Sequence, residues 1–274
     1  MPEGDSLHRL ALRLQPLVGE VIDSLILPRS TQPTSHLVGK HVERIEAFGK
    51  NLLIYIEGDW MLHVHLMMKG RFRLYARSSR ERFAESTVVV IRTANHEAVC
   101  THAPVVQLAR QGSLQFARGD VRSSVGPDLI REEDALDEAV TNLLGAGDEA
   151  LGVALMNQRL VSGIGNIWKS ELLFQARLNP FAKVSTFTRE TLLDVLTRGR
   201  ALMQANVNGT AVKGLSERDR WRRVARLQRK PGEGVLAVYQ RRGEACYVCG
   251  ETLQSKQQNV RWTYFCARCQ RTGD

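Results

Sequence analysis

The chain opens with MPEGDSLHRLALRLQPL (Met1–Leu17), a stretch that joins a reactive terminus to a helical pattern. Removal of Met1, which precedes the small residue Pro2, would expose a secondary amine beside the carboxylate of Glu3. An α-amino group has a pKa of about 8, so part of it is uncharged near neutral pH and can attack a carbonyl or hemiacetal carbon to form an iminium. Glu3 could then donate or accept the proton. Because many unreactive proteins also begin Met-Pro and fray at this end, an ordinary terminus is the alternative.

The residues that follow predict an amphipathic helix over 6–17. Apolar side chains recur at spacings of three and four residues, which is the period of one helix face. These side chains are Leu7, Leu10, Ala11, Leu14 and Leu17. Asp5 or Ser6 is expected to cap the first turn. The helix would hold Pro2 and Glu3 at its N-terminal end, where the helix dipole favours negative charge.

Between residues 21 and 116 the apolar segments are short and rich in β-branched residues, which is typical of strands. Strands are expected at 21–27, 52–56, 61–66 and 88–91. Glycine and polar turns separate them. This order favours an antiparallel sandwich or a flattened barrel over alternating βαβ units.

Two turns of this predicted sheet region carry candidate binding residues. Lys50 lies in the turn 48–51, directly before a predicted strand, where a lysine is most often simply solvated. Met67 and Met68 follow another strand, and successive side chains of a strand point to opposite faces. Either one methionine fills a gap in the core, or the pair forms a flexible apolar surface for which unstacked DNA bases are one partner.

A Gly-Pro break within 125–128 marks the change from strand to helix patterns and the predicted domain boundary. Helices are expected at 148–156, 166–176 and 188–206. The stretch 209–234 after them is long, polar and rich in arginine. Such a stretch fits either a functional loop or a solvated basic surface.

The first two of these helices flank a turn that contains Gly163 and Gly165. Glycine allows a tight turn, and Asn166 is expected to cap the second helix. The backbone N–H groups of such a helix N-terminus can bind a phosphate. Any pair of antiparallel helices also needs a turn, so this pattern alone does not establish a phosphate site.

Four of the five cysteines form two Cys-x-x-Cys pairs near the end of the chain: Cys246, Cys249, Cys266 and Cys269. This spacing favours one tetrahedral, structural Zn²⁺ over disulfides, with no open coordination position for catalysis. Arg261 lies in a predicted hairpin between the pairs, where its planar fork suits a phosphate. Cys100 stands alone in an apolar segment and is expected to be a buried core thiol.

Composition narrows the class of protein. The chain has 274 residues, 43% of them hydrophobic, which is enough for two globular domains. Lys and Arg number 38 against 29 acidic residues, and the net charge of +9 favours a polyanionic partner, most simply nucleic acid. No apolar run approaches the length of a membrane span and no signal peptide opens the chain, so a membrane protein is not expected.

Taken together, these segments resemble the formamidopyrimidine-DNA glycosylase / endonuclease VIII family of base-excision repair enzymes. The resemblance covers nearly the whole chain and rests on five segments in the family's order. These are Pro2-Glu3, Gly49–Leu53, His65–Gly70, Gln158–Glu171 and Arg261–Cys266. The chain departs from the family in having Asp5-Ser6 where a Pro-Glu pair is common, whereas Gly4 and 125–128 are more similar to the endonuclease VIII branch.

The resemblance implies an α+β fold in four parts. A two-layered antiparallel β-sandwich with flanking helices would span 1–122 and carry the catalytic residues. A linker would follow at 123–135, then a helix-two-turn-helix DNA-binding domain at 136–235. A zinc finger with a β-hairpin would end the chain at 236–274.

The resemblance also implies a bifunctional DNA glycosylase and lyase that removes oxidised bases, pyrimidines by the branch likeness, and nicks the strand by β- and δ-elimination. Pro2 is then the nucleophile and Glu3 the proton donor, while Lys50 binds phosphate near the damaged nucleotide. The other implied DNA-binding residues are Asn166 and Arg261 on the backbone, and Met67 and Met68 in the space left by the flipped nucleotide. The four paired cysteines would bind one structural Zn²⁺.

Three alternatives stay open at this point. The same chemistry could act on 8-oxoguanine or formamidopyrimidine lesions, or the chain could be a non-catalytic zinc-containing DNA-binding module or an RNA-binding zinc protein. Only an enzyme needs the Pro2-Glu3 pair. We expect a monomer that acts on damaged double-stranded DNA in the bacterial cytoplasm, associated with the nucleoid and not with a membrane.

Overall fold

A computed structural model describes residues 2–77, 83–111, 124–131, 134–208 and 236–271. The chain divides into two compact units, Met1–Ser124 and Val125–Asp274. Among the described helices, none is both long enough and apolar enough to cross a lipid bilayer.

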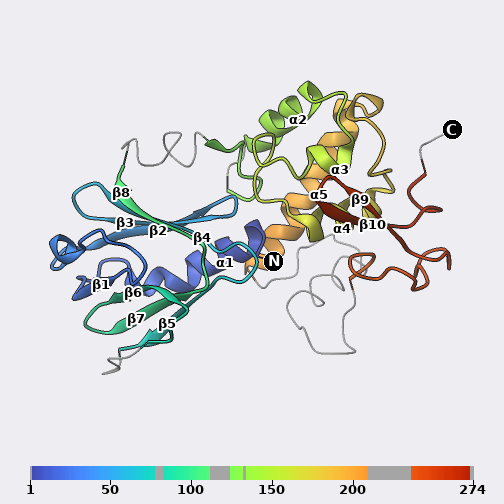
Figure 1. Cartoon of the computed structure of the whole chain (residues 1–274). Helices are drawn as coiled ribbons and strands as arrows, with labels where there is room; N and C mark the ends of the chain where they lie inside the picture. The colour runs from blue at the N-terminus through green and yellow to red at the C-terminus, as the bar shows by residue number, and fades with distance from the viewer. Residues whose placement is uncertain (1, 78–82, 112–123, 132–133, 209–235, 272–274) are drawn as a thin grey trace. The chain divides into compact units, whose positions relative to one another are not determined.

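The first unit is a sandwich of two four-stranded antiparallel sheets (Figure 1). One sheet has the order β1-β6-β7-β5 and the other β2-β3-β4-β8. The strands are β1 (Ser24–Ile26), β2 (Val42–Phe48), β3 (Asn51–Ile56), β4 (Trp60–His65), β5 (Arg71–Ala76), β6 (Thr87–Arg92), β7 (His96–Thr101) and β8 (Val105–Arg110). Three predicted strands therefore match β3, β4 and β6 closely, while 21–27 forms only the short β1.

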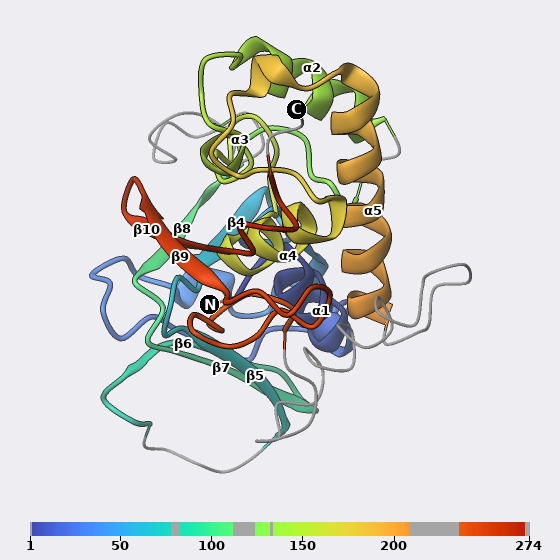
Figure 2. The same ribbon diagram turned by 90° about the vertical axis from the view of Figure 1, so that its right-hand side faces the viewer.

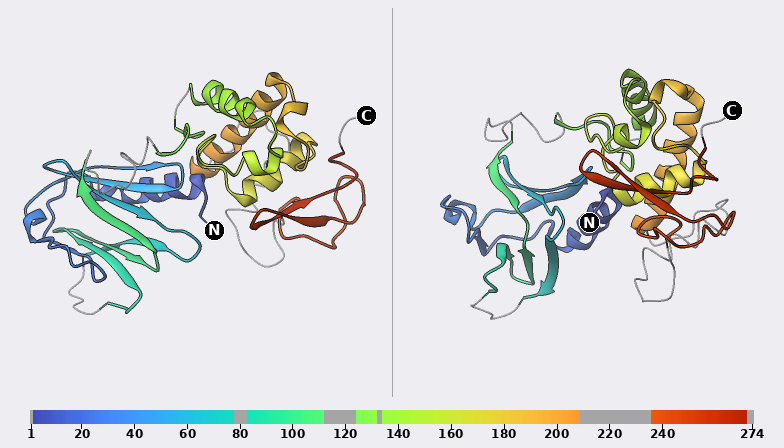
Figure 3. Two further views of the ribbon diagram at one scale, coloured as in Figure 1. Left: turned by 45° about the horizontal axis from the view of Figure 1, so that its top comes forward. Right: turned by 45° about the vertical axis from the view of Figure 1, so that its right-hand side comes forward.

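A single apolar core joins both sheets to the N-terminal helix α1 (Gly4–Leu14). Leu7 and Leu14 of α1 are buried in it with Leu52 of β3 and Val89 of β6. Figure 3 shows the two sheets as facing layers, with α1 running beside them. The expectation of a sandwich with a flanking helix is thus confirmed.

The predicted bounds of the first helix are wrong at both ends. It begins at Gly4 with the extended residue Glu3 as N-cap, so neither Asp5 nor Ser6 caps it. The α-helix ends at Leu14, and a 3₁₀ turn, η1 (Gln15–Leu17), follows. Pro16 explains this end, because proline has no N–H for the helical hydrogen bond.

The second unit is helical and ends in a β-hairpin (Figure 2). Its elements are α2 (Ala135–Gly145), α3 (Leu151–Ala154), α4 (Asn166–Ala176), η4 (Val184–Thr186), α5 (Arg189–Asn208), β9 (Gln254–Gln258) and β10 (Arg261–Phe265). Trp168 and Leu172 of α4 form a core with Val140 of α2 and Leu196 of α5. Helix α4 is therefore the central element, and its bounds are those predicted.

The predicted helix 148–156 is reduced to the four residues of α3. Long-range pairing explains the difference. Ala150 pairs with Lys183, and the N–H groups of Leu151 and Gly152 donate to the carbonyls of residues 182 and 180. A Cβ at Gly152 would lie 2.5 Å from Gln258 Oε1 and 3.0 Å from the carbonyl oxygen of Pro180, so glycine fits this close approach without displacing either group.

Candidate functional site

The terminus that carries Pro2 and Glu3 is held by the start of α1. The carbonyl oxygen of Glu3 accepts the N–H groups of Ser6 and Leu7, at 2.9 and 3.2 Å. Glu3 is fully buried and Pro2 is half-buried. Glu3 is thus the residue at the N-terminal end of α1, where the helix dipole favours negative charge, while Met1 lies outside the described residues.

Lys50 occupies a two-residue hairpin turn between β2 and β3. Phe48 pairs with Asn51, which leaves only Gly49 and Lys50 in the loop. Gly49 has a φ of 57°, the conformation that favours glycine at the first position of a type II′ turn. Lys50 is half-buried, so it differs from the freely solvated lysine of an ordinary turn tip.

Two histidines on β4 lie beside this turn. No role was predicted for His63 from the sequence, and His65 was named only as the first residue of the segment His65–Gly70. His63 Nε2 is 2.9 Å from Asn51 Oδ1, and its Nδ1 is 3.2 Å from Gln107 Oε1. Burial, assisted by the nearby charge of Lys50, lowers the pKa of His65 to about 4. His65 is therefore neutral near pH 7, and the Lys50 charge acts close to it. Single histidines in a strand have no periodic signal, so only their contacts reveal them.

The turn after β4 presents both methionines. Met67 and Met68 are 47% and 61% exposed, so neither fills a core gap. The Met67 N–H donates to His65 Nδ1 at 3.1 Å, and Met67 has a φ of 49°. Gly70 closes the turn through its N–H to the Leu66 carbonyl, and a Cβ on Gly70 would lie 2.4 Å from that oxygen. Of the two alternatives for this pair, the exposed apolar surface is the observed one.

In the second unit, Asn166 and Arg261 are brought to one region by a contact between α4 and β10. Asn166 Nδ2 donates to the carbonyl oxygen of Trp262, the residue after Arg261, at 2.9 Å. Gly165 is the N-cap of α4, so the prediction that Asn166 would cap it is wrong. The extended backbone of Gly165 places Asn166 in the first turn, where its side chain reaches the hairpin. Arg261 begins β10 and is exposed.

A buried lysine strengthens this contact. Lys169, which is 1% exposed, donates from Nζ to Thr263 Oγ1 at 2.7 Å. Thr263 Oγ1 in turn donates to Gln258 Oε1 at 2.6 Å, and Gln258 Nε2 donates to the Pro180 carbonyl. The turn before α4 is also fixed, because Gln158 contacts both Gly163 and Ile164. The arginine-rich stretch 209–234 lies outside the described residues.

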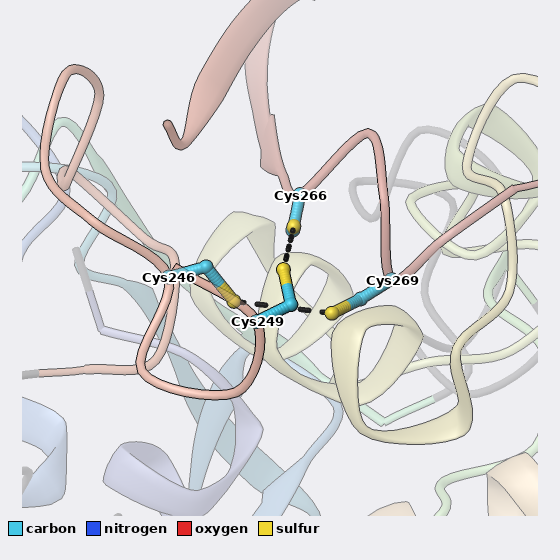
Figure 4. A group of neighbouring side chains, drawn as sticks. All are labelled: Cys246, Cys249, Cys266 and Cys269. Carbon is cyan, nitrogen blue, oxygen red and sulfur yellow. Dashed lines mark hydrogen bonds between the residues drawn. The ribbon is translucent and has the colours of Figure 1, made fainter. Parts of the chain in front are cut away.

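The four paired cysteines form one compact group (Figure 4). Their Sγ atoms all lie within 4.8 Å of one another, with 3.9 Å between Cys246 and Cys269 and 3.5 Å between Cys249 and Cys266. A Zn–S bond of about 2.3 Å in a tetrahedron requires sulfur separations of about 3.8 Å. The distances therefore suit a tetrahedral metal and are far too long for disulfides. A backbone N–H of Glu251 lowers the pKa of the Cys249 thiol to about 7, whereas burial raises the pKa of Cys266.

The fifth cysteine has the role expected of it. Cys100 lies in β7 and is fully buried in the core of the sandwich. Burial raises the pKa of its thiol to about 12, so it carries no thiolate at neutral pH. This confirms Cys100 as a core residue.

Comparisons with known proteins decide the family. Residues 1–122 match the model described as formamidopyrimidine-DNA glycosylase N-terminal domain, and residues 125–216 match the formamidopyrimidine-DNA glycosylase H2TH domain. The chain belongs to the formamidopyrimidine-DNA glycosylase family. Family membership makes it an enzyme of base-excision repair, in the class of DNA glycosylases with lyase activity.

Both branches of the family occur among its relatives. The chain is 32% identical to "Probable endonuclease 8 2" of Streptomyces coelicolor, with 98% of this chain and 94% of that protein covered. It is 28% identical to "Formamidopyrimidine-DNA glycosylase" of Listeria monocytogenes, with 99% and 100% covered. It is 29% identical to "DNA-(apurinic or apyrimidinic site) lyase Nei2" of Mycolicibacterium smegmatis, with 98% and 99% covered.

Solved structures of the family share the fold along the whole chain. MutM in complex with DNA containing carbocyclic 8-oxo-G gives a TM-score of 0.77 at 20% identity, covering 99% of this chain and 100% of that one. Lactococcus lactis formamidopyrimidine-DNA glycosylase, non-covalently bound to DNA containing an AP site, gives 0.76 at 21% identity, with 98% and 100% covered. These similarities confirm the α+β fold of sandwich, helical domain and hairpin.

Proposed function

We propose that this enzyme is a bifunctional glycosylase and lyase that removes oxidised pyrimidines through an iminium on Pro2. The observation that carries the proposal is the fully buried carboxylate of Glu3, held at the N-terminus of α1 beside Pro2. Within this DNA glycosylase family, a terminal amine next to a buried proton donor is the pair that the chemistry needs. No cysteine competes for the role, since Cys100 is buried and the others form the metal-ligand group.

The chemistry follows from these two residues. The uncharged Pro2 nitrogen attacks C1′ of the sugar, and the base leaves with the electrons of its glycosidic bond. The nitrogen then loses its N–H proton, which balances the proton that the departing base anion takes up. Glu3 donates a proton to the ring oxygen, the ring opens, and an iminium links Pro2 to C1′. The iminium acidifies the C2′–H bond, so loss of that proton expels the 3′ phosphate, and a second elimination expels the 5′ phosphate.

The remaining contacts would hold a bent duplex. Lys50 binds the phosphate backbone beside the damaged nucleotide, and Asn166 and Arg261 bind the backbone from the second unit. Met67 and Met68 occupy the space that the flipped nucleotide leaves. The half-buried Lys50, the shared contact of Asn166 with the Arg261 strand, and the exposure of both methionines support these roles. Backbone contacts of this kind set the register of the DNA without reading its sequence.

The four cysteines would hold one structural Zn²⁺ that orders the hairpin of β9 and β10. The sulfur separations support this assignment, and four protein ligands leave no position for a substrate. Zinc therefore supplies folding energy to the hairpin and no chemistry to the reaction.

A second substrate class has a specific observation in its favour. The relative from Listeria monocytogenes named formamidopyrimidine-DNA glycosylase matches the chain along its full length, as do relatives named endonuclease 8. The same chemistry on 8-oxoguanine or formamidopyrimidine is therefore the second candidate. Cleavage of a panel of duplexes, each with one oxidised base, separates the two.

The oligomeric state, cellular location and domain bounds of the enzyme are part of the same proposal. The enzyme acts as a monomer on damaged double-stranded DNA in the bacterial cytoplasm, at the nucleoid, and the three relatives described above come from bacteria. Its functional parts are the catalytic 1–122, the linker 123–135, the helix-two-turn-helix 136–235 and the zinc finger 236–274.

Borohydride trapping tests the proposal directly. Reduction converts the iminium into a stable amine, so a protein–DNA adduct should survive denaturing electrophoresis. Mass spectrometry should map the adduct to Pro2 and show that Met1 is absent. Glu3→Gln should bind DNA about as well as the wild type but should lose at least about a hundredfold in base removal, since general acid catalysis supplies about that much.

Three results would count against the mechanism. An adduct on Lys50 would mean that another amine is the nucleophile. Trapping by a variant that retains Met1 would exclude the Pro2 amine. Absence of any adduct on every oxidised-base duplex would favour a binding module without catalysis.

A further inference from the structure

His63 connects three strands of the sheet β2-β3-β4-β8 through its ring. It lies opposite Leu53 of β3 and Gln107 of β8, and it is 7% exposed. Its Nε2 is 2.9 Å from Asn51 Oδ1, and its Nδ1 is 3.2 Å from Gln107 Oε1. A polar ring in so buried a position is stable only when both nitrogens have partners.

The partners of Asn51 fix which nitrogen of His63 carries the hydrogen. Asn51 Nδ2 donates to the Phe48 carbonyl at 3.1 Å, so Asn51 Oδ1 is the acceptor in the contact with His63. His63 must then donate from Nε2. Burial lowers the pKa of His63, so the ring is neutral and its Nδ1 is an acceptor. Gln107 presents Oε1 to Nδ1 at 3.2 Å, and a neutral ring with its hydrogen on Nε2 requires the Gln107 amide to be turned by 180°, so that its NH₂ group donates to Nδ1.

The Asn51 side chain closes the turn that carries Lys50. Phe48 and Asn51 are the paired residues on either side of the two-residue loop. The link from His63 to Asn51 and on to Phe48 therefore ties the loop to β4, and Gln107 ties the ring to β8. Loss of the link would leave Asn51 with a buried acceptor and no donor, which favours a different turn geometry.

We propose that His63 is a positioning residue for Lys50, acting through Asn51 to hold the turn between β2 and β3 in one geometry. This inference rests on the proposed phosphate-binding role of Lys50 and deepens it. A lysine that must meet one phosphate benefits from a fixed turn, because a small displacement of a binding group from its productive position lowers the rate steeply.

A matched pair of variants separates positioning from mere stability. His63→Gln keeps an N–H donor at the place of Nε2, whereas His63→Leu removes it while keeping similar volume. Cleavage of a duplex with one abasic site should fall about tenfold in His63→Leu and return to within about threefold of the wild type in His63→Gln. Equal losses in the two variants would overturn the inference.

A double-mutant cycle with Lys50→Ala tests whether His63 acts through Lys50. If it does, adding His63→Leu to Lys50→Ala should cost less than about twofold, in cleavage and in binding to a duplex with a tetrahydrofuran abasic analogue. Losses that multiply would mean that His63 acts independently, and would overturn the proposal. Asn51→Leu should reproduce the His63→Leu loss, which keeps the test valid if one variant unfolds.

A spectroscopic measurement decides the geometry without any DNA. Long-range ¹H–¹⁵N spectra of the wild type should show His63 neutral with its hydrogen on Nε2. His63→Leu should shift the amide signals of Gly49 and Lys50 more than His63→Gln does. A charged ring or the Nδ1–H form would overturn the inference, whereas a protein that passes this test but never cleaves or binds DNA would refute the proposed function instead.

Discussion

Glu171, in the middle of α4, carries one of the most buried carboxylates of the second unit. It is 1% exposed, and its Oε2 accepts the N–H of Ala237 at 2.8 Å. Its Oε1 accepts the N–H groups of Val238 and Tyr239, at 2.9 and 3.0 Å. One side chain thus holds residues 237–239, which precede the cysteine group, against α4.

This contact gives the first prediction. Glu171→Gln replaces one acceptor oxygen by a donor, which leaves at least one of the three N–H groups without a partner. A buried donor without a partner costs about 1–3 kcal/mol. Hydrogen exchange at Ala237, Val238 and Tyr239 should accelerate about tenfold or more. Glu138→Gln, an exposed change in α2, is the control, and unchanged exchange in Glu171→Gln would show that the carboxylate does not hold this segment.

The buried His65 gives a second prediction. Its pKa in the folded protein is about 4, below the ordinary value of 6.5. As pH falls, the unfolded state takes up the proton first, so the stabilisation associated with neutral His65 is complete above pH 6.5 and is lost between pH 6.5 and about 4. His65→Gln should make the stability of β3 and β4, from hydrogen exchange, less dependent on pH in this window.

The control for that prediction is His102→Asn, because His102 is exposed and asparagine tolerates its φ of 57°. It should keep the wild-type pH dependence. An equal flattening in both variants would trace the effect to histidines in general and not to the buried His65.

Helices and strands with a clear local sequence pattern lie close to where the sequence predicts them. Helix α4 has the bounds predicted for it, and strands β3, β4 and β6 coincide closely with runs of apolar, often β-branched residues. Helix α3 is shorter than predicted because its first N–H groups pair with carbonyls about thirty positions away, which no local pattern contains. Likewise, His63 meets Asn51 and Gln107 from 12 and 44 positions away. Candidate site residues that lie in motifs could thus be predicted from the sequence. The side chains that contact and support them, such as His63, could not, because their partners are far away in the chain.

The turn after β4 carries the third prediction. In the role proposed for Met68, its side chain replaces the flipped nucleotide, so Met68→Ala should slow excision from a duplex about tenfold. The same lesion in single-stranded DNA should be affected far less, since little pairing or stacking is disrupted there. Val38→Ala, a change at an apolar side chain that is 51% exposed, should affect neither substrate. Equal losses on both substrates would assign Met68 a structural role.

The described residues form separate apolar cores in the two units. One apolar cluster fills the sandwich, and another surrounds α4, while the cysteine group packs with Phe174 and Leu253 in a third, small cluster. A net charge of +9 gives the chain a general attraction to polyanions that salt weakens. Because the cysteine group packs in a cluster separate from the core of the sandwich, damage to that group should leave the sandwich folded.

The fourth prediction follows from that separation. Cys249→Ser should lose zinc and weaken binding to every duplex, because the hairpin that carries Arg261 loses its order. Circular dichroism and hydrogen exchange should show Met1–Ser124 still folded. Cys100→Ala is the control and should keep its metal. Freshly purified wild-type protein without zinc, or full DNA binding by Cys249→Ser, would contradict the assignment.

The exposure of Met67 and Met68 has a chemical consequence of its own. Peroxide converts an accessible thioether into a sulfoxide, which is polar and can be reduced back enzymatically. Met68 is 61% exposed, so the oxidants that damage DNA bases reach it directly. Because a sulfoxide is polar, a sulfoxide at this turn would favour contact with water over packing between stacked bases. If the enzyme removes oxidised bases, as proposed, oxidative stress would increase the amount of substrate and at the same time lower the activity of the enzyme, until a sulfoxide reductase restores the side chain.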